Sequence, residues 1–192
     1  LTEPVAAWSR ALSRAAAAKL LAHTSRVWLA LDEPALGLDV DDEERATAAT
    51  ILHAAMDDLR DSGVRAGLHC CSPPPFDRLD RIRPDWLSFD LVRFGVDARE
   101  HAGGLSDFLS AGGELLLGVL PPLPRDDDPD PLTLIDDFVA ALRGQGADAD
   151  SLARLSLSPS CGTLLAPKSR ERQVAARLAE LARHLEERIA QP

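Results

Sequence analysis

The chain has 192 residues, of which 45% are hydrophobic and 27% are charged, and these proportions are typical of a soluble globular domain. Its 31 acidic residues outnumber 21 basic ones, and the net charge of −10 argues against nucleic acid or an anionic membrane as a partner. The apolar runs are only as long as strands, so we predict no membrane-spanning segment. Three cysteines suit a reducing compartment and disfavour a disulfide framework, so we expect a cytoplasmic protein.

The first elements are predicted from apolar spacing. Residues 4–22 carry apolar side chains at the spacing of one helical face, and residues 27–31 form a short apolar run typical of a buried strand. A second helix is predicted over residues 41–60, with acidic residues in its first turn, where they interact favourably with the helix dipole. The Ser62-Gly63 pair is predicted to end that helix.

The same alternation continues to the end of the chain. Strands alternating with helices over short loops indicate a parallel α/β fold, and apolar strands indicate a sheet covered on both faces. The remaining predicted strands are residues 64–70, 86–91, 115–120 and 155–158, and the remaining predicted helices are residues 75–82, 102–111, 132–143 and 169–189.

Five predicted strands are each followed by a helix, and one helix precedes them. A doubly wound sheet would fit this count, but no glycine-rich phosphate-binding turn follows any strand. Polar and reactive residues instead follow the strand ends, which is where the active sites of (β/α)₈ barrels lie. Five units are fewer than eight, and such barrels usually need roughly 250 residues. We therefore expect residues 1–192 to form the C-terminal part of a single (β/α)₈ TIM barrel, completed by a missing N-terminal part or by self-association.

A zinc site is predicted at the ends of these strands. In the His69-Cys70-Cys71 segment, His69 and Cys71 point to the same side because side chains alternate along an extended chain, while Cys70 is expected in the core. Cys161, at the end of the last strand, would complete a Cys₂His set for Zn²⁺ with an exchangeable fourth position. Asp90, at the end of an intervening strand, is a candidate fourth ligand. A buried structural cysteine is the common alternative for any single one of these thiols.

A carboxylate follows the first predicted strand, in the Asp32-Glu33-Pro34 segment. Pro34 predicts a rigid turn that directs Asp32 to one place, and a carboxylate at the mouth of a barrel is suited to holding the ammonium group of an amino-acid substrate. A solvated loop or a helix cap is the alternative interpretation of the two acids.

Four segments follow the predicted strands in order: Leu31-Asp-Glu-Pro-Ala-Leu36, Leu68-His-Cys-Cys71, Leu87-Ser-Phe-Asp90 and Ser158-Pro-Ser-Cys-Gly162. In order and spacing they resemble the C-terminal, zinc-bearing barrel of cobalamin-independent methionine synthase. They are closer still to its short, single-barrel relatives, within the superfamily that includes uroporphyrinogen decarboxylase. The likeness runs from about residue 27 to the last helix.

The resemblance implies roles for five residues. His69, Cys71 and Cys161 match zinc ligands, and Asp90 stands where the family has a glutamate ligand. Asp32 matches the acid that holds the amino group of homocysteine. In the family, zinc keeps the homocysteine thiol as a thiolate, which attacks a methyl group on folate N5. The resemblance thus implies a zinc-dependent methyltransferase of methionine biosynthesis, with a small-molecule thiol acceptor and a methyl donor of the folate type as partners.

The sequence also departs from the family pattern. Leu38 stands where full-length members carry an acid that contacts the folate, and the loop after residues 115–120 lacks the histidine that serves there as proton donor. These departures concern the methyl donor and leave thiol activation intact. Two alternatives therefore stay open: a truncated or non-catalytic homologue that binds zinc or an amino acid, and a metal-free enzyme similar to uroporphyrinogen decarboxylase.

Overall fold

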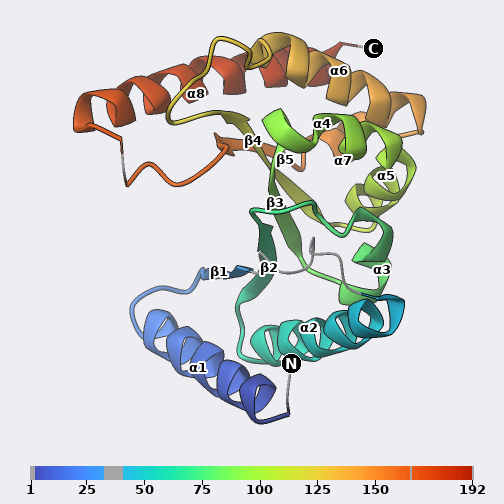
Figure 1. Cartoon of the computed structure of the whole chain (residues 1–192), viewed down its shortest axis with the longest axis vertical. Coiled ribbons are helices and arrows are strands. Elements are labelled where there is room, and N and C mark those ends of the chain that lie inside the picture. The colour runs from blue at the N-terminus through green and yellow to red at the C-terminus, as the bar shows by residue number, and fades with distance from the viewer. Residues whose placement is uncertain (1–2, 33–40, 165, 192) are drawn as a thin grey trace. The chain divides into compact units, whose positions relative to one another are not determined.

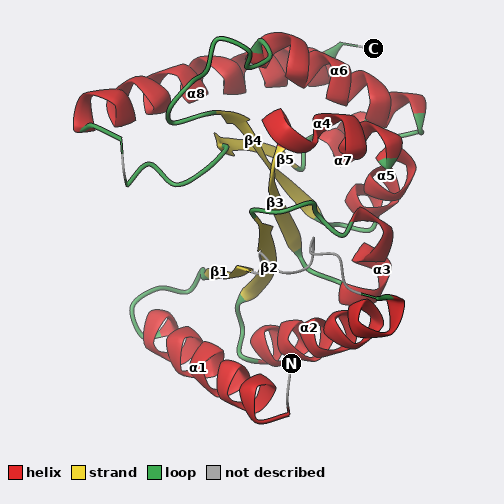
Figure 2. Cartoon of the chain, in the orientation of Figure 1, coloured by secondary structure: helices red, strands yellow, loops and turns green. Residues whose placement is uncertain are grey.

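Strands and helices alternate along the chain in the computed structural model, which describes residues 3–32, 41–164 and 166–191 (Figures 1 and 2). The strands are β1 (Trp28–Asp32), β2 (Arg65–Cys70), β3 (Trp86–Asp90), β4 (Glu114–Leu120) and β5 (Leu155–Pro159). The helices are α1 (Glu3–Leu21), α2 (Asp42–Asp61), α3 (Leu79–Ile82), α4 (Leu91–Glu100), α5 (Ala102–Ser110), α6 (Pro131–Gly144), α7 (Ala149–Leu152) and α8 (Lys168–Ala190), with a 3₁₀ turn, η2 (Phe76–Arg78), before α3.

The five strands form one sheet in the order β1-β2-β3-β4-β5, so spatial order follows chain order. β1 pairs in parallel with β2, and β4 pairs in parallel with β5. A doubly wound sheet would instead reverse its strand order at a switch point. The predicted mixed α/β class with alternating βα units is confirmed, and the sequential order is compatible with part of an α/β barrel.

The chain divides into a first unit, Leu1–Leu87, and a second unit, Ser88–Pro192. In the first unit α1 packs beside α2, and α2 packs on β2 (Figure 1). Leu52, Met56 and Leu59 lie on one face of α2 because their spacing matches the helical repeat, and all three are buried. Burial of each such side chain contributes about 1.5–3 kcal/mol, so this face fixes α2 on the sheet.

Capping interactions define both ends of α2. The carboxylate of Asp41 accepts a hydrogen bond of 2.8 Å from the backbone N–H of Glu44, which is the interaction of an N-cap. At the other end Ser62 is the C-cap, and Gly63 follows with φ of 86°. Glycine adopts this left-handed conformation at low cost, so the predicted helix end is confirmed.

In the second unit α6 is the central helix, since it packs against α4, α5 and α8. Its apolar face is buried, and Phe138 meets Phe89 of β3 edge to face, with ring centroids 6.4 Å apart. The buried residues of α6 are Leu134, Ile135, Phe138, Val139 and Leu142.

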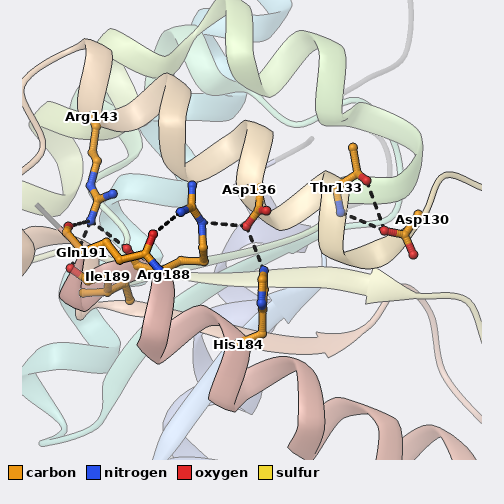
Figure 3. A network of polar contacts seen from close by, with 8 residues as sticks. All are labelled: Asp130, Thr133, Asp136, Arg143, His184, Arg188, Ile189 and Gln191. Atoms are coloured by element: carbon orange, nitrogen blue, oxygen red, sulfur yellow. Dashed lines mark hydrogen bonds and ion pairs between the residues drawn. The ribbon is translucent and has the colours of Figure 1, made fainter.

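Polar contacts join α6 to α8 beside this apolar face (Figure 3). Asp136 of α6 lies 2.8 Å from His184 Nε2 and 2.8 Å from Arg188 Nε, both on α8. The guanidinium of Arg143 donates to the carbonyl oxygens of Arg188 and Ile189, at 2.8 and 3.0 Å. The last carbonyls of a helix have no partner within the helix, so Arg143 supplies donors to the end of α8.

Two helices were not predicted, α4 and α7. The predicted strand over residues 86–91 ends one residue earlier, because Asp90 accepts a hydrogen bond from the backbone N–H of Arg93 and thereby caps α4. Asp148 caps the single turn of α7 in the same way, through the N–H of Ser151. At α4 the aspartate begins the helix directly after the strand, so no loop marks the boundary in the sequence. α7 has only four residues, too few for an apolar periodicity to predict it.

Candidate metal centre

Three metal-ligating side chains gather where β1 and β2 end. Asp32, the last residue of β1, is the register partner of His69 on β2, and Cys71 follows β2 directly. Partners in register lie on the same face of a sheet, and residues two apart share a face as well. Parallel pairing therefore brings the carboxylate, the imidazole and the thiol to one side of the sheet.

The distances among the three donor groups are short. His69 Nε2 lies 3.1 Å from Cys71 Sγ, and Asp32 Oδ1 lies 4.0 Å from the same sulfur. One donor atom from each residue lies within 4.8 Å of the other two. Donors bound to one tetrahedral zinc ion at 2.0–2.3 Å are about 3.4–3.6 Å apart, so the cluster needs only small side-chain adjustments to hold such an ion.

The donor set is chemically mixed and accessible. Asp32 and Cys71 are exposed, and His69 is half-buried. An oxygen, a nitrogen and a sulfur donor together suit Zn²⁺, which binds all three ligand types. Exposure on one side leaves access for an exogenous ligand. Cys70 is fully buried, as predicted for the residue whose side chain points to the opposite face.

Asp90 lies at the end of β3 in the second unit, where it is buried. One carboxylate oxygen accepts from the backbone N–H of Arg93 at 3.1 Å. Burial raises the pKa of Asp90 above its ordinary value, against the opposing effect of the backbone amides of Arg93 and Val92. The carboxylate therefore already has a structural role as the cap of α4, and its predicted role as a zinc ligand stays a prediction.

Cys161 also belongs to the second unit, where it follows β5 and is exposed. The segment that carries it passes close to β4: a Cβ atom on Gly118 would lie 2.7 Å from the Cα of Ser160 and 3.2 Å from the Cα of Asp90. Glycine at position 118 thus lets the chain before Cys161 approach the end of β3. Ligation of zinc by Cys161 stays a prediction.

The sequence predicted each residue of the Asp32, His69 and Cys71 cluster but gave Asp32 a different role. It assigned this carboxylate to a substrate ammonium group, whereas the structure places it beside the predicted zinc ligands. The position of Asp32 beside His69 follows from the register between β1 and β2. The spacing of residues along a single strand does not predict it. The other motif positions near Asp32, namely Glu33, Pro34 and Leu38, lie outside the described residues.

Comparison with protein-family models gives no match, and a search among the curated proteins gives none either. The family resemblance therefore depends on the four sequence segments themselves. Within residues 3–32, 41–164 and 166–191, no helix is long and apolar enough to cross a membrane.

Proposed function

We propose that this chain is a zinc-dependent methyltransferase of the cobalamin-independent methionine synthase type, which transfers a methyl group to a thiol acceptor such as homocysteine. The observation that supports it best is the cluster of Asp32, His69 and Cys71 at adjoining strand ends, with a nitrogen–sulfur distance of 3.1 Å. A metal site at the carboxyl ends of parallel strands is where barrel enzymes carry their chemistry.

The residues of the chain define what the site does. His69 must offer a neutral imidazole nitrogen and Cys71 a thiolate, so metal binding releases a proton and strengthens as the pH rises. Zinc, when bound, lowers the pKa of a thiol and so supplies the acceptor as a thiolate nucleophile near neutral pH. In the reaction the acceptor sulfur bonds to the methyl carbon as the bond from that carbon to the donor breaks; the acceptor loses a proton and the donor gains one.

We also propose that the five-stranded sheet is part of a (β/α)₈ barrel. Sequential strand order and a helix after every strand support this, because a barrel adds each βα unit beside the previous one. A further segment or a second copy of the chain would supply the remaining units. Cys161 and Asp90 stay predicted zinc ligands within this proposal.

The proposal is tested on the purified chain. We expect about one zinc ion per chain by elemental analysis, and methyl transfer to homocysteine from 5-methyltetrahydrofolate, with methionine detected by mass spectrometry. The Cys71→Ser variant should lose both properties, and Cys161→Ser tests the predicted ligand in the second unit. A chain that holds no zinc and transfers no methyl group to a thiol would exclude the proposal.

The exposure of Asp32 and Cys71 favours one alternative, a protein that binds zinc without catalysis, because barrel active sites usually exclude water around the reacting atoms. The same experiment separates the two functions. Zinc bound with full stoichiometry, but without methyl transfer to any thiol, would identify the non-catalytic protein.

A further inference from the structure

We propose that Asp32 is a metal ligand, beside His69 and Cys71, and that recognition of the acceptor thiol consequently does not depend on an α-ammonium group. The assignment of the ligand rests on the geometry of the first unit alone. The statement about the acceptor rests in addition on the proposed function. Both parts differ from the role that the sequence suggests for Asp32, which is to hold the amino group of the acceptor.

The position of the carboxylate supports ligation. Asp32 Oδ1 lies 4.0 Å from Cys71 Sγ, only slightly farther than the roughly 3.6 Å expected for an oxygen and a sulfur on one tetrahedral zinc ion. His69 Nε2 and Cys71 Sγ, at 3.1 Å, are slightly closer than that value. The donor atoms of all three residues lie within 4.8 Å of one another, so side-chain rotation can bring them toward a common ion.

The sheet holds Asp32 in this place. Because Asp32 is the register partner of His69, the backbone of two paired strands fixes the separation of the two residues. Ligands on paired strands are more precisely positioned than ligands on loops. The carboxylate therefore faces the imidazole and the thiol before any metal or substrate binds.

Charge balance links this ligand to the class of acceptor. Within the first unit the carboxylate of Asp32 and the thiolate of Cys71 supply two negative charges, which balance a divalent cation, while the imidazole of His69 is neutral as a ligand. A carboxylate bound to the cation has no net charge left to attract an ammonium group.

The first experiment tests whether Asp32 binds the metal ion. The full chain is freed of metal with a chelator and titrated with Co²⁺, whose visible absorption reports the number and type of its ligands. We expect Asp32→Asn to weaken Co²⁺ binding at least about 10-fold and to change the spectrum, since even partners of metal ligands contribute 10–100-fold to affinity. The matched control is Asp42→Asn, whose carboxylate has 93% exposure and should bind Co²⁺ like the unchanged chain. Unchanged affinity and spectrum in Asp32→Asn would overturn the assignment.

The second experiment tests whether the site recognises the amino group of the acceptor. It compares the affinities of two thiols that differ only in that group, homocysteine and 4-mercaptobutyrate. We expect both to perturb the Co²⁺ spectrum with affinities within about 3-fold, because a charge-assisted bond to the ammonium would give tenfold or more. A tenfold preference for homocysteine that disappears in Asp32→Asn would overturn the proposal. Absence of methyl transfer to either thiol, with Co²⁺ binding as expected, would exclude the proposed function and leave the ligand assignment standing.

Discussion

The indole ring of Trp86 lies directly over Gly67, so close that a Cβ atom on Gly67 would be 1.9 Å from the ring carbon Cε2. Both residues belong to the first unit, and Gly67 lies two residues before His69 on β2. The face of the sheet that carries His69 therefore also holds a buried tryptophan, which only glycine at position 67 permits.

Gly67→Ala should destabilise the chain by about 1–3 kcal/mol, the usual cost of overpacking. Alanine restricts the unfolded chain more than glycine does, which stabilises the folded chain by only about 0.4–1 kcal/mol. The clash with Trp86 costs more, so the net change in stability is a loss. Urea unfolding monitored by tryptophan fluorescence measures the difference. The control is Gly104→Ala in α5, where a Cβ atom meets nothing within 4 Å and alanine should stabilise the helix by roughly 0.5–1 kcal/mol. Equal stability of the Gly67→Ala chain would contradict the contact with Trp86.

Gly118→Ala should affect the two predicted ligands of the second unit. A Cβ atom at this position would lie 2.7 Å from the Cα of Ser160 and 3.0 Å from the carbonyl oxygen of Phe89. Both are backbone atoms and yield less easily than a side chain. We expect a loss of stability of about 1–3 kcal/mol and an altered rate of labelling of the Cys161 thiol by a disulfide reagent.

Gly144→Ala, at the end of α6, is the control for the Gly118 substitution, because nothing lies within 4 Å of its Cβ position. It should leave the labelling rate of Cys161 unchanged. If Gly118→Ala also leaves that rate and the stability unchanged, the close approach of Ser160 to β4 is wrong.

Most of the fold could be predicted, because apolar periodicity and capping residues are local signals. The strand predicted over residues 27–31 is β1 shifted by one residue, and the helix predicted over residues 41–60 is α2 with its cap at Asp41. α4 escaped prediction because Asp90 was assigned to chemistry and to the end of a strand, whereas its side chain begins a helix.

The site could be predicted in its residues but not in their mutual arrangement. Alternation along one strand puts His69 and Cys71 on the same side, and this inference needs no tertiary structure. The position of Asp32 opposite His69 depends on the register between β1 and β2, which is set by packing of whole elements. The role of an individual carboxylate therefore requires the structure.

Cys70 and Cys71 are neighbours with opposite roles, and this gives a further prediction. Cys71→Ser should remove most bound zinc, because a hydroxyl is a poor zinc ligand compared with a thiolate. Cys70→Ala should keep the metal and cost about 1 kcal/mol of stability, comparable with deletion of one buried methyl-sized group, because Cys70 is fully buried. Elemental analysis and urea unfolding measure the two effects. Metal loss in Cys70→Ala with full retention in Cys71→Ser would reverse the assignment of the two faces.

Asp90 gives a prediction about pH. Burial raises the pKa of Asp90 above the ordinary value of 3.8, so the folded chain binds this proton more tightly than the unfolded chain. The contribution of Asp90 to stability is therefore most favourable below pH 3.8 and falls as the pH rises through the raised pKa. Asp90→Asn removes the ionisation and keeps an acceptor for the N–H of Arg93, since asparagine caps helices about as well as aspartate.

We therefore expect the Asp90→Asn chain to be as stable as the unchanged chain near about pH 4 and more stable near about pH 7, where more of the buried carboxyl group is ionised. Asp90→Ala distinguishes the effect of the helix cap from the effect of the charge. It removes the buried charge, as Asp90→Asn does, but it also leaves the N-terminus of α4 without its side-chain acceptor, at a cost of about 0.5–2 kcal/mol. Urea unfolding of the three chains at both pH values measures these differences. A free energy of unfolding that falls equally between the two pH values in Asp90→Asn and in the unchanged chain would show that Asp90 titrates at its ordinary pKa.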